Sequence, residues 1–138
     1  MADTPLLSVE DLRVSFNTPK GVVEAVRGID FELGQERLGI VGESGSGKSQ
    51  TGRAILRLIS GNGRIEAKKM EFDGIDLLSA NERRMRSIRG NRISMIMQDP
   101  QYSLNPVMTV GSQIAEAYRV HSKAGRREAR DRALDMLE

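Results

Sequence analysis

The sequence contains no cysteine and no tryptophan, and only five of its 138 residues are aromatic. Without cysteine, the chain cannot form a disulfide scaffold or a cysteine-ligated zinc or iron–sulfur centre. Its single histidine, His121, excludes a multi-histidine metal site. No apolar run approaches the roughly 18 residues that a membrane-spanning helix requires, and the first residues lack the apolar core of a signal peptide. These absences favour a cytoplasmic protein.

The composition that remains is sufficient for a packed core. Hydrophobic residues make up 38% of the chain and charged residues 29%, with a net charge of +2. This balance is typical of a folded soluble domain and argues against wholesale disorder. The length fits one domain or one piece of a larger domain.

The first third of the sequence is typical of β-structure. Apolar residues alternate over residues 7–16, with one slip at Glu10-Asp11, and residues 18–21 form a predicted turn. A further stretch over residues 22–33 is predicted as strand, with a bulge at Gly28. The short apolar run over residues 38–41 is bounded by glycines and predicts a buried central strand.

Strand–loop–helix units are predicted for the rest of the chain. Helices are expected over residues 48–59, 81–88, 110–118 and 124–138, and strands over residues 65–72 and 93–97. A β-rich start followed by such units indicates an α/β or α+β architecture.

The strongest motif lies between the strand predicted at residues 38–41 and the helix that follows. Residues 42–49 read Gly-Glu-Ser-Gly-Ser-Gly-Lys-Ser, which fits the phosphate-binding pattern G-x-x-x-x-G-K-[ST]. Its glycines allow backbone N–H groups to converge on an anion, and the helix adds the positive end of its dipole. Lys48 is predicted to reach the β- and γ-phosphates and Ser49 to place its hydroxyl on Mg²⁺. The alternative is a flexible Gly/Ser loop.

Two further segments give this loop a family context. Together with residues 38–49, the segments Met95–Pro100 and Ser103–Pro106 resemble the ATP-binding subunits of ABC transporters. The Q-D-P-x-x-S-L-N-P pattern beginning at Gln98 is similar to the dipeptide/oligopeptide importer branch. The resemblance covers nearly the whole chain.

The resemblance implies an α/β fold of the ABC-type P-loop NTPase class. The chain would be the N-terminal part of one ATPase domain, holding an antiparallel β-subdomain and part of a parallel-sheet core. Its expected divisions are residues 1–36 for the antiparallel region, 37–106 from the phosphate loop to the Q-loop, and 107–138 for the start of a helical subdomain.

The resemblance also assigns site residues for ATP and Mg²⁺. Phe16 matches the aromatic residue that stacks on adenine, although a core phenylalanine is the alternative. Gln98 matches the Q-loop glutamine that contacts Mg²⁺ and the attacking water, and a loop-capping glutamine is the alternative. Lys48 and Gln98 are the expected catalytic residues, and Ser49 and Gln98 the metal ligands. The expected nucleotide-binding set is Phe16, Gly42, Glu43, Ser44, Gly45, Ser46, Gly47, Lys48, Ser49 and Gln50.

Three motifs of the family are not found in this sequence: the signature motif, the Walker B strand ending in Asp-Glu, and the switch histidine. His121 lies on a predicted polar helix and is interpreted as a surface residue. We therefore expect a truncated segment that binds ATP and does not hydrolyse it efficiently alone. Exposed strand edges would lower its solubility or make it depend on a partner.

The resemblance implies permease subunits and a second ATP-binding subunit as partners, at the inner face of the cell membrane. Asp99–Pro106 would contribute to the permease contact. No nucleic acid is expected, because the basic stretch has no interleaved aromatic residues and the net charge is only +2. This stretch is interpreted as a solvated face, with a contact to acidic lipid headgroups or the membrane subunit as the alternative; its arginines are Arg83, Arg84, Arg86, Arg89 and Arg92. The alternatives are a non-catalytic nucleotide-binding fragment and an ABC-type ATPase acting on DNA or ribosomes. The transported solute stays open among dipeptides, oligopeptides, nickel and other cargo.

Overall fold

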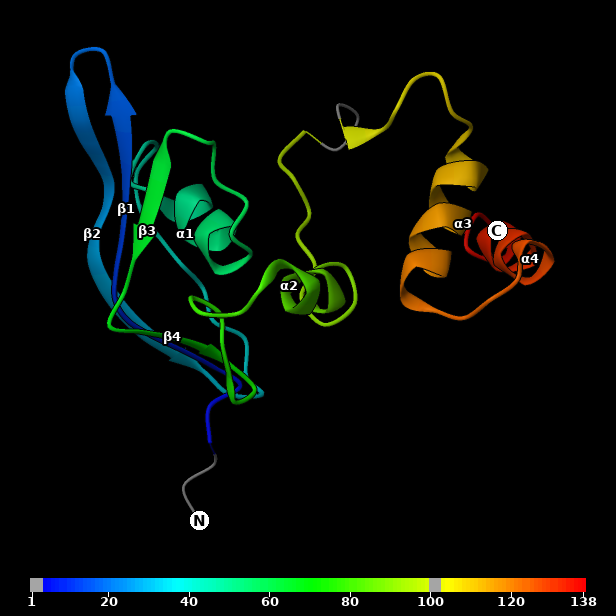
Figure 1. The fold of residues 1–138 in the computed structure, drawn as a ribbon, viewed down its shortest axis with the longest axis horizontal. Coiled ribbons are helices and arrows are strands. Elements are labelled where there is room, and N and C mark those ends of the chain that lie inside the picture. Colours follow the sequence, from blue (N-terminus) through cyan, green and yellow to red (C-terminus); the bar gives the residue numbers. More distant parts are fainter. Residues whose placement is uncertain (1–3, 100–102) are drawn as a thin grey trace. The chain divides into compact units, whose positions relative to one another are not determined.

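The computed structural model describes residues 4–99 and 103–138. The chain divides into two compact units, Met1–Met85 and Arg86–Glu138. The first unit holds every strand assigned in the described residues and the helix that follows the glycine-rich loop, whereas the second holds a helical hairpin (Figure 1).

A long antiparallel hairpin organises the first unit. Strand β1 (Leu7–Thr18) pairs with β2 (Gly21–Leu33) around the predicted turn. The slip predicted at Glu10-Asp11 is confirmed, because the register shifts between Val9 and Leu12, and Asp11 has a φ of 48°. The bulge predicted at Gly28 is also confirmed, because the register shifts between the pairs Leu12–Ile29 and Arg13–Arg27, and Gly28 has a φ of 96°. Strand β2 continues through it as one element.

Three short strands complete the sheet on the other side of β1. Strand β3 (Gly63–Glu66) pairs with residues 13–16, and β4 (Lys69–Phe72) pairs with residues 7–10. The single strand predicted over residues 65–72 is therefore two strands with a break between them. Strand β5 (Ile75–Asp76) returns after Asp73 and Gly74, which have φ values of 47° and 74°. Two consecutive positive φ values are typical of a tight hairpin turn.

The core of this unit lies against one face of the sheet. Helix α1 (Lys48–Ile55) contacts β1 and β2. The fully buried side chains include Leu12, Val9 and Val14 of β1, with Met70 and Leu77 from β4 and the segment after β5. Because Val9 and Val14 point to the core from an irregular strand, the bulge at Asp11 keeps both on the same side.

Two predicted strands of the parallel core are not strands in this structure. Residues 38–41 have no regular secondary structure, and Val41 is 96% exposed. Residues 93–97 contain one isolated bridge at Ile93, and Ile96 is 92% exposed. An apolar run becomes a buried strand only when neighbouring strands pair with it, and no described strand pairs with either segment.

The helices of the second half lie close to their predicted positions. Helix α2 (Glu82–Ile88) begins after Asn81, whose side chain accepts from Arg84 N, and the boundary between the units falls within it. Helices α3 (Val110–His121) and α4 (Arg126–Asp135) pack together, with Ala129 and Ala133 buried between them. His121 is exposed, as predicted. None of the described helices is both long and apolar enough to cross a membrane.

Candidate functional site

The glycine-rich loop at residues 42–49 has a backbone that other residue types would strain. Gly45 and Gly47 have φ values of 81° and 95°. A Cβ atom at Gly47 would lie 2.4 Å from the carbonyl oxygen of Ala25 in β2, and one at Gly42 would lie 2.5 Å from the Ser46 Oγ atom. The loop therefore closes on itself and rests directly on β2, which explains why glycine stands at these positions.

The loop ends at the N-terminus of α1, which is prepared to receive an anion. Gly47 is the N-cap residue, and no side chain caps the helix. No acidic residue lies in its first turn, while Arg53 lies in its last turn. The first intrahelical bond runs from Thr51 N to Gly47 O at 2.9 Å. The N–H groups before Thr51 therefore have no helical acceptor and carry the positive end of the dipole.

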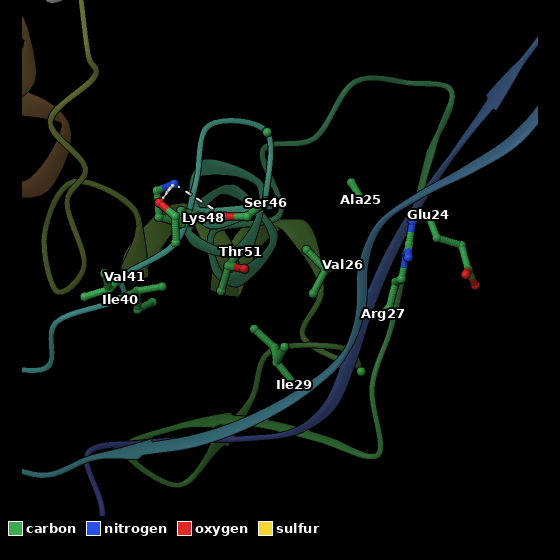
Figure 2. Close-up of a pocket in the computed structure, with 13 residues that line it drawn as sticks. Glu24, Ala25, Val26, Arg27, Ile29, Ile40, Val41, Ser46, Lys48 and Thr51 are labelled. Atoms are coloured by element: carbon green, nitrogen blue, oxygen red, sulfur yellow. Dashed lines mark hydrogen bonds between the residues drawn. The ribbon is translucent and has the colours of Figure 1, made fainter.

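Lys48 places its ammonium group over the loop. Its Nζ atom donates to the carbonyl oxygens of Gly42 and Glu43 at 2.7 and 2.6 Å and to Ser46 Oγ at 3.4 Å (Figure 2). The side chain is half-buried. The oxygens that hold the ammonium group belong to neutral groups, so no carboxylate competes there with an anionic phosphate.

A cavity of about 550 Å³ lies between the loop and β2. Val26 and Ile29 of β2 face Thr51 of α1 across it, and Lys48 lies at its edge (Figure 2). Thr51 is only 2% exposed and donates from Oγ1 to Gly47 O at 3.1 Å. This second bond to the N-cap carbonyl fixes the start of the helix.

Sequence reasoning missed the contributions of β2 and Thr51 to this site. The contact between Ala25 and Gly47 joins residues far apart in the chain, and no local pattern signals it. Thr51 stands three residues after Lys48, where a hydroxyl bonding back to the i−4 carbonyl was a detectable signal.

The other predicted residues of the loop are open to solvent or partly so. Glu43, Ser44 and Ser49 are exposed, and Gln50 is half-buried. No cluster of three acidic or histidine residues able to hold a metal occurs in the described residues. The Ser49 hydroxyl still fits Mg²⁺, because this ion usually keeps several waters and takes its remaining ligands from a few protein oxygens and substrate phosphates.

Phe16 lies in β1 and does not line the cavity. It stands opposite Val23 of β2 and Gly63 of β3, and a Cβ on Gly63 would lie 2.8 Å from the ring. The ring is half-buried, so part of its surface remains open for a planar ligand.

Gln98 belongs to the second compact unit, whereas the loop belongs to the first. It is exposed and lies outside regular secondary structure, as does Asp99. The approach of Gln98 to the phosphate loop therefore stays a prediction from the resemblance. Pro100 and the next two residues of the predicted Q-D-P-x-x-S-L-N-P segment lie outside the described residues.

The described remainder of that segment is ordered by side-chain bonds. Asn105 N donates to the Gln113 Oε1 atom at 2.9 Å, and Gln113 Nε2 donates to the carbonyl oxygens of Asn105 and Met108. Thr109 then caps α3 by accepting from Ser112 N. In the basic stretch, four arginines (Arg84, Arg86, Arg89 and Arg92) are engaged with other residues, so the stretch is not a row of free cations.

Comparisons with known proteins identify the family of the chain. The family described as "ABC transporter" matches residues 26–138. The chain is 47% identical to the oligopeptide transport ATP-binding protein OppD of Bacillus subtilis over 98% of its length and 38% of that protein. It is also 47% identical to OppD of Escherichia coli K12, over 96% of the chain and 40% of that protein. The chain therefore spans about two fifths of these relatives.

The similarity in fold extends to solved structures. The ATP-binding cassette MJ0796, in a post-hydrolysis dimer bound to ADP and Pi, matches 95% of this chain and 55% of its own with a TM-score of 0.67. At 19% identity this likeness concerns the fold alone. It confirms the predicted P-loop NTPase fold class, although the sheet formed by the described residues is antiparallel.

Proposed function

The chain belongs to the ABC transporter family, and from this premise we propose that it grips the phosphates of ATP for a peptide importer. The observation that carries the proposal is the loop at residues 42–49, where Lys48 lies beside the uncapped N-terminus of α1. A triphosphate placed there receives backbone N–H donors and an ammonium group together. The OppD relatives, described as oligopeptide transport proteins, support the peptide class of solute.

We assign the individual roles as follows. Lys48 binds the β- and γ-phosphate oxygens, and the N–H groups at the start of α1 share the negative charge. Ser49 offers a hydroxyl to Mg²⁺, which would neutralise the charge between the phosphates. Phe16 offers the exposed part of its ring to the adenine base. Gln50 directly follows the phosphate loop and completes the proposed nucleotide-binding residues.

Gln98 is assigned to the water that attacks the γ-phosphate and to Mg²⁺. Its amide suits this role because the oxygen accepts a hydrogen bond from water or coordinates a metal. The role requires Gln98 to approach the phosphate loop in the complete ATPase, together with groups that this sequence does not contain. The chain then binds ATP without efficient turnover.

We further propose that the complete protein is peripheral to the inner face of the cell membrane. Its partners there are permease subunits and a second ATP-binding subunit. The names of the relatives support this assignment because they describe ATP-binding proteins of peptide transport. Asn105, which is bonded to Gln113, belongs to the segment that we assign to the permease contact.

The proposal is tested by MgATP titration of the 138-residue chain and its Lys48→Ala variant. Loss of the charged hydrogen bonds is expected to weaken MgATP binding by about 10- to 100-fold. Lys20→Ala is the matched control, because Lys20 is exposed in the hairpin turn away from the cavity. Unchanged affinity in Lys48→Ala would exclude the phosphate-loop assignment. Robust ATPase turnover by the 138-residue chain would exclude the proposal that it binds ATP without hydrolysing it efficiently.

A further inference from the structure

The end of helix α1 has an unusual residue. Arg57 follows the C-cap Leu56 and has a φ of 54°, in the left-handed region. Leu58 N donates to Arg53 O at 2.8 Å, and Arg57 N donates to Ala54 O at 2.9 Å. These bonds form a Schellman motif, in which glycine or asparagine usually takes the left-handed position. Helix α1 therefore ends here, four residues earlier than predicted, at a residue whose backbone is strained.

The side chain of Arg57 offers a reason for its presence. It is half-buried, and its Nη1 atom donates to the carbonyl oxygens of Ala80 and Leu77, the latter at 3.4 Å. Leu77 is fully buried. A guanidinium group that bonds two carbonyls joins the end of α1 to the segment between β5 and α2, which glycine could not do.

This segment is itself held in shape by Asp76. The Asp76 carboxylate accepts from Ser79 Oγ at 2.7 Å and from Leu78 N at 2.9 Å. These bonds, with Ser79 first, lower the pKa of Asp76 below its usual value of 3.8. Ala80 N also donates to Asp76 O at 3.1 Å. The two carbonyls that Arg57 binds are therefore presented by a preformed turn.

We propose that Arg57 is a positioning residue for the phosphate loop, an inference that rests on the proposed function. Helix α1 has eight residues and is about 12 Å long. It begins at Lys48 and ends beside Arg57, so fixing its far end fixes the direction in which Lys48 and the first N–H groups point. The bond from Thr51 to Gly47 transmits the helix position to the loop.

The test compares Arg57→Gly with Arg53→Ala in the 138-residue chain. Glycine relieves the backbone strain but removes the whole arginine side chain with both guanidinium bonds, and because these two effects oppose each other we expect only a small change in the unfolding temperature. MgATP and tripolyphosphate, which has no base, should both bind about three- to tenfold more weakly. Arg53→Ala removes an arginine from the last turn of the same helix, outside the cavity beside the loop, and it should change either affinity less than about twofold.

Arg57→Lys provides a second variant in which the strain and the positive charge remain. One ammonium group replaces the planar fork, and we expect a loss of affinity smaller than that of Arg57→Gly. Unchanged tripolyphosphate affinity in Arg57→Gly would overturn the proposal, as would an equal loss in Arg53→Ala. Lys48→Ala in the same assay separates the two ideas: if Lys48→Ala also leaves binding unchanged, the proposed function itself fails.

Discussion

The phosphate loop and the segment of residues 93–99 that carries Gln98 differ in what surrounds them. The loop rests on β2 through Gly47 and Ala25, and its lysine is held by the loop's own carbonyl oxygens. The Gln98 segment has one isolated bridge at Ile93 and exposed side chains around the glutamine. The loop is thus supported by neighbouring elements within the described residues, whereas the position of the glutamine is not set by any described strand.

This difference separates binding from turnover. The loop needs a hairpin, a helix and its own glycines, all of which lie between β1 and the end of α1. The segment around Gln98 needs a neighbouring strand to fix the position of the glutamine side chain, since a lone strand leaves its backbone N–H and C=O groups without partners. We expect the first function to survive in this chain and the second to depend on further structure.

The largest expected contrast is in backbone hydrogen exchange. Amides of β1 that pair with β2 should exchange about 1,000-fold more slowly than those of residues 38–41 and 95–97, because paired amides exchange only when the sheet opens. Exchange measured residue by residue by NMR provides the comparison. Equal protection in both sets would show that the two segments have strand partners and would remove the distinction.

A smaller contrast is expected between two glycines of the loop. Gly47→Ala should lower the free energy of unfolding by about 2–4 kcal/mol, because strain at its positive φ adds to a clash with Ala25 O. Gly45→Ala is the matched control, since its φ is also positive but its Cβ would meet open space, and about 1–2 kcal/mol is expected. Urea unfolding of both variants measures the difference. Equal losses would mean that the loop does not rest on β2.

The smallest effect is expected at Gln98 itself. Gln98→Ala should change the MgATP affinity of this chain by less than about twofold, because an exposed side chain in an unpaired segment adds little to binding. MgATP titration of Gln98→Ala and Lys48→Ala under the same conditions compares the two losses of affinity. A loss at Gln98 comparable to the loss at Lys48 would show that the segment already contacts the nucleotide, and the comparison would no longer hold.

Much of the fold was predictable because local signals determine it. The slip predicted at Glu10-Asp11 and the bulge predicted at Gly28 both appear in the structure as shifts in the register of β1 and β2. The phosphate loop followed from its glycines and Lys48. The length of α1 was not predictable from apolar spacing, because Arg57 ends the helix through a left-handed backbone and contacts with Leu77 and Ala80.

The two wrong strand predictions at residues 38–41 and 93–97 share one physical cause. The apolar runs at residues 38–41 and 93–97 have the composition of buried strands, but composition does not supply the neighbours that bury them. Contacts such as that of Ala25 with Gly47 arise only when the chain has folded, so no window of sequence contains them. The phosphate loop was predicted from its sequence motif, whereas its contact with β2 was found only in the structure.

The close approach of Gly47 to Ala25 also has a genetic consequence. Every amino acid other than glycine carries a Cβ atom, so no missense change at this codon avoids the carbonyl oxygen of Ala25. Gly61, Gly111 and Gly125 have neither a positive φ nor a neighbour within 4 Å of an added Cβ. Among random variants selected for a folded protein, we expect few substitutions at codon 47 and many at codons 61, 111 and 125. The difference in tolerated substitutions would identify the position at which the loop contacts the sheet.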